Sequence, residues 1–263
     1  MAAKIERNVL ATVLENVRSS QFAGADPLFA CGTDDSGELR AVALRVPPWP
    51  LLATDIDASD ANTLLDVWLR EDPGLPGVNG QPVTARAIAA GWAAITGGST
   101  RVRMREAMHV LEEVRDPPRR ARGTLRAARS TERDVLTRWM RAFAEEAGVL
   151  GADRAAEIVD AQLSRGRLFV WDDHGPVSLV SISPTIAAVT RIGPVYTAPQ
   201  RRRRGYASSA VAATSRRALA AGAQRFALFT DLANPTSNKI YADVGYRRLA
   251  EWEEHAFERP ATP

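Results

Sequence analysis

The segment PQRRRRGYASS places four arginines, residues 201–204, directly before Gly205. The apolar stretch RIGPVYT before it predicts a strand, and the alanine-rich stretch after it predicts a helix. The first N–H groups of a helix have no internal partners and carry partial positive charge, so they bind anions. Gly205 lets the backbone approach an anion closely, and arginine suits phosphate. This turn is therefore predicted to hold a phosphate group, although it is neither a P-loop nor a dinucleotide fingerprint.

The positive charge of the chain is local to this turn. The sequence has 34 basic and 31 acidic side chains, and without residues 201–204 it has 30 basic and 31 acidic ones. A nucleic-acid-binding protein spreads Lys and Arg over a whole face, so we expect a small anionic ligand and no nucleic acid. Binding to RNA or DNA is the alternative, and its steep weakening by salt would reveal it.

Other chemistry finds little support in the sequence. Cys31 is the only cysteine, and His109, His174 and His255 are scattered without ligand spacing, so no metal site is expected and each histidine is expected to be structural or exposed. There is no G-x-S-x-G motif for a hydrolase. No apolar segment approaches a membrane span, and the N-terminus lacks a signal peptide. We expect a cytoplasmic protein without membrane partners, either a monomer or a homodimer.

The chain has an internal repeat. PLFACGTDDSGELRAVALRVPP, from Pro27, parallels RLFVWDDHGPVSLVSISP, from Arg167, and both predict β-hairpins. Each hairpin is followed by another strand, a turn and a helix. The segment RDPPRRARG predicts a linker, so we expect domains at residues 1–116 and 124–263 with a linker at 117–123. This alternation predicts a mixed α/β fold.

The two halves differ at the turn after the third strand. The second half has the arginines there, whereas the first half has Asp55, Asp57 and Asp60. Three carboxylates would repel a phosphate. We therefore expect an anion site in the second half alone.

Two sequence blocks carry a resemblance to a known family. The pattern Arg202-x-x-Gly205-x-Ala207 resembles the Gln/Arg-x-x-Gly-x-Gly/Ala signature of the GNAT superfamily of acyl-CoA-dependent N-acyltransferases. The later segment LFTDLANPTSNKIYADVGY resembles the family's second block, with Asn234, Tyr241 and a Gly-Tyr pair at residues 245–246. The resemblance covers roughly residues 125–259, and the first half resembles a degenerate copy. It implies two tandem GNAT-like lobes, each a mostly antiparallel mixed sheet flanked by helices.

The resemblance implies acetyl-CoA as co-substrate. The backbone of a short strand segment would hydrogen-bond the pantetheine arm, the arginine turn would hold the pyrophosphate, and two asparagines would contact the pantetheine or phosphate flank. These cofactor-binding positions are Val195, Tyr196, Thr197, Arg202, Arg203, Arg204, Gly205, Tyr206, Ala207, Ser208, Asn234 and Asn238. Many family members carry glycine at the position of Arg203.

The expected reaction is acetyl transfer from acetyl-CoA to a primary amine of a small molecule by direct attack. The resemblance places Tyr241 at the thioester sulfur as proton donor, and an aromatic core residue is the alternative for it. Asn234 also suits a helix N-cap before a proline. Glu145 and Glu146 are candidates for the base that accepts the amine proton. The alternative function is a catalytically weak sensor or regulatory protein that binds acyl-CoA.

Overall fold

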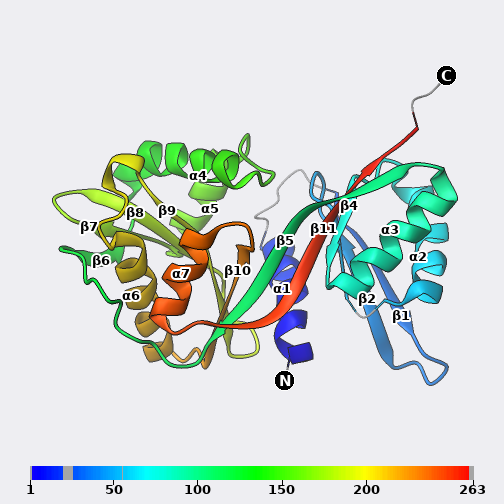
Figure 1. Ribbon diagram of the computed structural model, residues 1–263, viewed down its shortest axis with the longest axis horizontal. Coiled ribbons are helices and arrows are strands. Elements are labelled where there is room, and N and C mark those ends of the chain that lie inside the picture. Colours follow the sequence, from blue (N-terminus) through cyan, green and yellow to red (C-terminus); the bar gives the residue numbers. More distant parts are fainter. Residues whose placement is uncertain (1, 20–25, 55, 261–263) are drawn as a thin grey trace. The chain divides into compact units, whose positions relative to one another are not determined.

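The computed structural model describes residues 2–19, 26–54 and 56–260. The chain divides into two compact units, Met1–Ala107 with Ala250–Pro263, and Met108–Leu249. Both are built from a mostly antiparallel mixed sheet with helices against it (Figure 1). The mixed α/β class with two similar lobes, expected from the sequence, is confirmed.

The boundaries of these units differ from the residue ranges expected from the sequence. The expected linker at 117–123 packs within the second unit: Ala121 is buried and its N–H donates to Ser209 Oγ at 2.9 Å. The Trp171 indole also donates to the Arg122 carbonyl at 2.6 Å. Proline and charge predicted a linker, but these long-range contacts bind the segment to the fold. The end of the chain, residues 250–258, belongs to the first unit.

The first unit begins with a helix and three antiparallel strands, followed by two helices that enclose a parallel strand. Leu51, Leu65 and Trp92 are fully buried in its core. Strands β1 to β3 pair antiparallel in order, and β3 pairs parallel with β4. The elements are α1 (Ala2–Arg18), β1 (Leu28–Thr33), β2 (Leu39–Arg45), β3 (Leu51–Thr54), α2 (Ala58–Glu71), β4 (Gly77–Gly80) and α3 (Pro82–Thr96).

The second unit repeats this order after an additional strand, a 3-10 turn and one additional helix. Strands β7 to β9 pair antiparallel, and β9 pairs parallel with β10. The pairing of β7–β10 therefore matches that of β1–β4, as the internal repeat predicts. The elements are β6 (Thr124–Ala127), a 3-10 turn (Ser130–Glu132), α4 (Arg133–Ala147), α5 (Ala155–Ser164), β7 (Leu168–Asp172), β8 (Pro176–Ile182), β9 (Val189–Thr197), α6 (Tyr206–Ala220), β10 (Arg225–Asp231) and α7 (Pro235–Val244).

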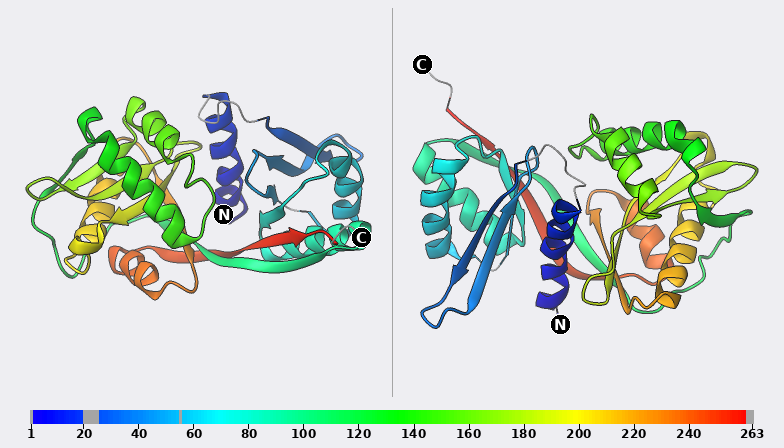
Figure 2. Two further views of the ribbon diagram at one scale, coloured as in Figure 1. Left: turned by 90° about the horizontal axis from the view of Figure 1, so that it is seen from above. Right: turned by 180° about the vertical axis from the view of Figure 1, so that it is seen from behind.

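Two long strands contribute to both units. Strand β5 (Ser99–Leu111) ends in the second unit, and β11 (Arg247–Glu258) begins there and ends in the first, where it pairs with β4. Strands β5 and β11 are neighbours in the sheet, and Figure 2 shows them side by side. Each unit is thus completed by a strand that the sequence assigns to the other half.

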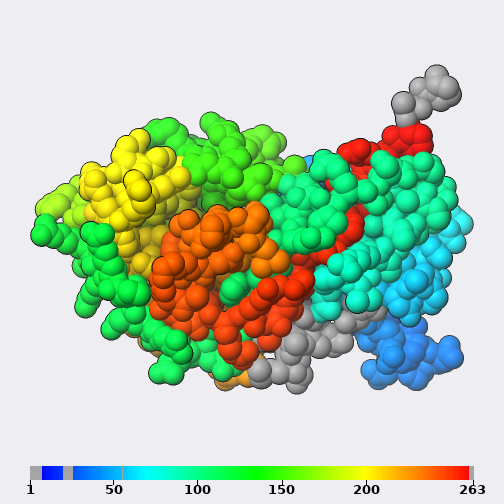
Figure 3. Space-filling model, viewed as in Figure 1, coloured from blue at the N-terminus to red at the C-terminus, as the bar shows by residue number. Residues whose placement is uncertain are grey.

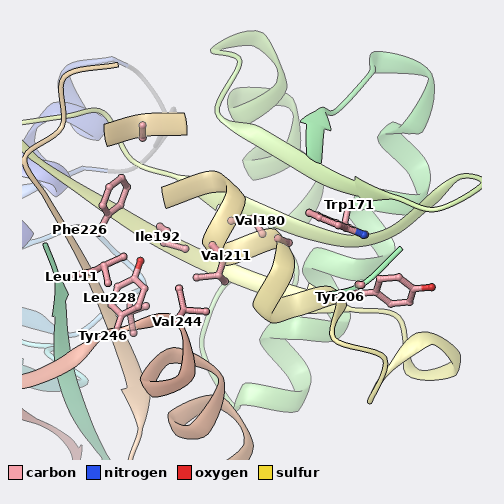
Figure 4. Close-up of a cluster of buried hydrophobic side chains, with 14 of the residues drawn as sticks. Leu111, Trp171, Val180, Ile192, Tyr206, Val211, Phe226, Leu228, Val244 and Tyr246 are labelled. Atoms are coloured by element: carbon pink, nitrogen blue, oxygen red, sulfur yellow. The ribbon is translucent and has the colours of Figure 1, made fainter. Parts of the chain in front are cut away.

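The sheet of the second unit is covered on both faces. Leu168, Leu179 and Tyr196 pack with α4 and α5, whereas Phe226 and Leu228 pack with α6 and α7. The second of these clusters, drawn in Figure 4, also contains Leu111 of β5 and Tyr246 at the end of α7. The α6–α7 face carries the predicted anion-binding turn.

Candidate functional site

Strands β9 and β10 part from each other at one end. Their parallel pairing covers residues 189–191 of β9 and 225–227 of β10, although β9 continues to Thr197 and β10 to Asp231. A bulge in β9 lies between the residues that face Val180 and Ile182 of β8. Beyond it, the backbone edge of residues 195–197 has no β10 partner. Such an edge can hydrogen-bond an inserted extended chain.

The bulge also reverses which side chains face each layer. Ile192 and Val195 both pack on the α6–α7 side, although they are three positions apart in the strand, and Tyr196 then packs on the α4–α5 side. Regular alternation would place residues 192 and 195 on opposite faces. The bulge therefore directs the Tyr196 phenol toward α4.

The N-terminus of α6 has no side-chain cap. Gly205 is the N-cap residue, with φ 82°, and no side chain bonds the first N–H groups of the helix. A Cβ at this position would lie 2.7 Å from the Arg119 carbonyl oxygen, so glycine is required on steric grounds as well. Uncapped N–H groups and the helix dipole make this end suitable for an anion. The structure thus gives the arginine turn the geometry that the sequence predicts.

The arginines of the turn have different surroundings. All four are exposed, and the loop around residue 200 lies at the surface (yellow in Figure 3). Arg203 has φ 61°, in the left-handed region that favours glycine, and its carbonyl accepts from Arg119 Nη1 at 3.3 Å. Glycine would adopt this φ without strain, whereas arginine is uncommon there.

Arg202 is bound within the protein. Its Nη2 donates to both carboxylate oxygens of Glu146, at 3.0 and 2.7 Å, and its Nε donates to the Thr197 carbonyl at 3.0 Å. The Tyr196 hydroxyl also donates to Glu146, at 2.8 Å, and the Arg202 guanidinium lies 5.2 Å from the Tyr196 ring centre. Burial and the Glu146 carboxylate raise the pKa of Tyr196. These contacts join the turn, β9 and the last turn of α4.

The two candidate bases differ in their surroundings. Glu146 is held by Arg202 and Tyr196, whereas Glu145 is exposed and its carboxylate has no hydrogen bond within the described residues. A carboxylate beside a strand edge can contact a ligand there, so Glu146 is the better placed of the two.

The remaining residues of the turn combine structural contacts with open backbone. The Tyr206 side chain is buried with the α6–α7 cluster (Figure 4). Its hydroxyl donates to Asp173, which raises the pKa of the phenol. Ser208 Oγ donates to the Gly205 carbonyl at 3.1 Å, and Ala207 is partly exposed. For Tyr206 and Ala207, only the backbone N–H is available to a ligand.

Helix α7 places the second sequence block beside β10. Asn234 is its N-cap and accepts from the Ser237 N–H at 3.1 Å, so the expected cap is present. Asn238 accepts from Thr230 Oγ1 at 2.5 Å and donates to the Asp231 carbonyl at 3.2 Å. The Asn238 side chain thus holds the end of β10 that extends beyond its pairing with β9.

Tyr241 follows on the same helix. Its ring packs against the α6–α7 cluster and lies edge-on to Tyr246, with 5.7 Å between ring centres. Burial raises the pKa of Tyr241 well above its usual value. The described residues offer its hydroxyl no hydrogen bond. Tyr241 is therefore partly buried against the core, which fits the alternative of an aromatic packing residue, and it keeps a protonated hydroxyl that a ligand can use.

His109 is a polar residue of this region for which the sequence predicted a structural or exposed position and no role in the site. It is buried on β5, and its Nε2 lies 3.2 Å from Thr230 Oγ1. Because the Thr230 hydroxyl donates to Asn238, the His109 Nε2–H must donate to the Thr230 oxygen, so His109 carries its proton on Nε2. Burial and the nearby Arg248 charge lower the pKa of His109. In the sequence, the burial of His109 is indicated only by its apolar neighbours in the stretch AMHVL.

In the first unit, the helix N-terminus that corresponds to the start of α6 is capped by a side chain and is not open to an anion. Asp57 caps α2, with its carboxylate accepting from the Ser59 and Asp60 N–H groups at 2.9 and 3.0 Å. These bonds lower the pKa of Asp57. Strand β3 pairs with β4 over three of its four residues, so the two strands do not part as β9 and β10 do. Asp55 lies outside the described residues.

Neither a membrane span nor a metal-ligand cluster is found among the described residues. None of their helices is both long and apolar enough to cross a membrane. Within the same ranges, no three His, Cys, Asp or Glu side chains gather as metal ligands would.

Part of the second unit matches a known protein family. Residues 133–246, which span α4 to the end of α7, match the model of the Acetyltransferase (GNAT) family. A search of curated proteins gave no match.

Solved structures are similar over nearly the whole chain. A GCN5-related N-acetyltransferase from Kribbella flavida is 17% identical, with a TM-score of 0.65 over 98% of this chain and 96% of that one. Another from Sphaerobacter thermophilus is also 17% identical, with a TM-score of 0.59 over 94% and 86%. A tandem GNAT protein from the clavulanic acid biosynthesis pathway is 10% identical, with a TM-score of 0.55 over 91% and 85%. These structures share the fold.

Proposed function

Because residues 133–246 match the model of the GNAT acetyltransferase family, we propose that this protein transfers the acetyl group of acetyl-CoA to a primary amine of a small molecule. The observation that carries the proposal is one arrangement in the second unit. An uncapped helix N-terminus at Gly205 follows a strand whose last residues have no partner on the β10 side. The second unit is then the catalytic lobe, and the first is a lobe without a cofactor site.

The residues of the second unit fit acetyl-CoA. The backbone of residues 195–197 would bond the pantetheine arm as an added strand, and the N–H groups of residues 203–208 would hold the pyrophosphate. Asn234 and Asn238 flank this position at the start of α7. Acetyl-CoA supplies an activated thioester. The protein therefore has to position the amine, accept one proton from it and donate one proton to the departing thiolate.

The first proton belongs to the amine, which must be neutral to attack. A carboxylate or an ordered water would accept it. Glu146 lies next to the Tyr196 phenol and is the better candidate, and Glu145 is the second. The second proton goes to the departing thiolate. Tyr241 keeps its phenol protonated at neutral pH because burial raises its pKa, so it can donate.

The acceptor is proposed to be a small amine. The site supports a cationic acceptor because Glu146 already holds a cation, the Arg202 guanidinium. The alternative function, an acyl-CoA sensor of low activity, would use the same donor site. It is favoured if acetyl-CoA binds tightly and no amine is acetylated.

The experiment combines calorimetry with a thiol-release assay. Acetyl-CoA is titrated into the protein, and CoA release is then followed with a panel of amines, amino acids and aminoglycosides. Turnover with an amine supports the transferase, and binding without turnover supports the sensor. A protein that binds no acetyl-CoA would refute both.

A substitution at Ala207 tests the anion site without disturbing the fold. Glutamate in the first turn of a helix interacts favourably with the helix dipole, so Ala207→Glu should leave the melting temperature unchanged or raised. It should weaken acetyl-CoA binding at least about tenfold more than the uncharged control Ala207→Gln, because like charges repel at close range. Gly205 is unsuitable for this test, since any side chain there meets the Arg119 carbonyl.

A further inference from the structure

Arg202 has two possible sets of partners, one at the start of α6 and one on α4 and β9. It is the first residue of the signature that leads into the open end of α6, where the proposed function puts a diphosphate. Yet its guanidinium is directed to Glu146 on α4 and to the Thr197 carbonyl on β9. Both partners belong to the region where the acetyl donor and the acceptor would meet.

The contact between Arg202 and Glu146 is open to exchange. The Arg202 and Glu146 side chains are 42% and 48% exposed, although their nitrogen and oxygen atoms are 2.7 Å apart. Ion pairs with this degree of exposure contribute little to stability, because water screens them and two long side chains must be ordered. A ligand with more than one negative charge, placed at a helix N-terminus, competes effectively for the same guanidinium.

Glu146 would keep its position without Arg202. The Tyr196 hydroxyl donates to Oε1 of Glu146 at 2.8 Å, and the Tyr196 side chain is fixed by burial against α4 and α5. The carboxylate thus retains one hydrogen bond that orients it. Its second oxygen, which accepts from Arg202 at 2.7 Å, becomes free for another cation.

We propose that Arg202 changes partners during the reaction cycle, from Glu146 in the free protein to the diphosphate of the bound acyl-CoA. The change uncovers the Glu146 carboxylate, which then receives the ammonium group of the acceptor. The inference rests on the proposed function and deepens it: the acceptor is cationic, and it binds after the donor. In the free protein the guanidinium takes the place of that ammonium group.

The exchange makes an unusual prediction for binding of acetyl-CoA. If Glu146 competes for Arg202, its neutral variant Glu146→Gln releases the arginine and tightens acetyl-CoA binding, by about two- to fivefold for a pair of this exposure. Glu145→Gln is the matched control, because it removes the same charge from the adjacent, exposed position on α4. It should change the affinity for acetyl-CoA by less than about 1.5-fold. Glu145 makes no contact with Arg202, so its replacement removes only a negative charge whose long-range effect on the ligand is screened by salt.

Substitutions in the turn test the other half of the exchange. Arg202→Gln should weaken acetyl-CoA binding more than Arg201→Gln, which removes the same charge one residue earlier. In the double variant Arg202→Gln/Glu146→Gln, the gain from Glu146→Gln should disappear, because no arginine remains to be released. The comparison of Arg202→Gln with Arg201→Gln also serves as the test if Glu146→Gln proves unstable in thermal melting.

The results separate the inference from the proposed function. Calorimetry is run on the intact chain with acetyl-CoA, in parallel for all variants. Equal affinities of Glu146→Gln and Glu145→Gln, or weaker binding by the former, would overturn the exchange and leave the acyl-CoA site standing. Equal losses for Arg202→Gln and Arg201→Gln would overturn it as well. A wild-type protein that binds no acetyl-CoA would refute the site and the exchange together.

Discussion

Replacement of Tyr241 by phenylalanine separates the two roles that the structure allows for this residue. The ring packs against the α6–α7 cluster and meets Tyr246 edge-on, and phenylalanine keeps both contacts. The hydroxyl has no hydrogen bond within the described residues, so its removal leaves no partner unsatisfied. The melting temperature should therefore change by less than about 2 °C.

The expected kinetic effect is much larger. The Tyr241 phenol stays protonated through the assay range because burial raises its pKa, so it can donate to a thiolate at any pH near neutrality. A general acid typically contributes ~10²–10⁴-fold to the rate. This corresponds to about 3–5 kcal/mol of the activation barrier. We expect kcat to fall by this factor while the affinity for acetyl-CoA stays the same.

Tyr246→Phe is the matched control. Its hydroxyl lies 3.2 Å from Ser215 Oγ in the core, so its loss costs about 0.5–1.5 kcal/mol of stability. It should leave kcat unchanged, which is the reverse of the effect at Tyr241. The assay is CoA release with the best amine of the panel, with thermal melting of each variant. If Tyr241→Phe turns over at the wild-type rate, Tyr241 is a packing residue and another group protonates the thiolate.

Three further predictions concern local features of the fold. Asp57→Ala should lower the melting temperature by about 2–4 °C, because α2 loses its N-cap, and leave acetyl-CoA binding unchanged; weaker binding in a titration would contradict a closed first unit. Arg203→Gly should raise the melting temperature by about 1–3 °C and Arg203→Ala should not, because the left-handed φ of 61° favours glycine alone; equal melting of both variants would be the contrary result. The free energy of unfolding should fall as pH drops below about 6.5, because the pKa of His109 is lowered in the folded state and the unfolded chain binds the proton first. Arg248 adds to this effect, and urea unfolding of His109→Gln at pH 7.5 and 5.5 should show a smaller fall; an equal fall would assign the pH dependence to other groups.

Local sequence patterns determined the parts of this protein that depend on neighbouring residues. The Asp and Gly turns predicted the hairpins, and the arginine-glycine turn before an alanine-rich stretch predicted a helix start open to an anion. Asn234 before a proline predicted an N-cap, which the structure contains. The aspartates around position 57 predicted a first half closed to phosphate, and the Asp57 cap supports it. In each of these cases the deciding hydrogen bonds or dihedral angles lie within about four residues.

Tertiary structure decided which distant residues meet. Arg202 bonds Glu146 across 56 positions, and His109 reaches Thr230 across 121. Neither contact follows from composition or periodicity. The first depends on the bulge in β9 that turns Tyr196 toward α4, and the second on a strand order that places β5 beside β10. The last strand likewise belongs to the first unit for residues 250–258, since sheet pairing joins it to β4. Packing and strand register set these contacts, and both are properties of the whole chain.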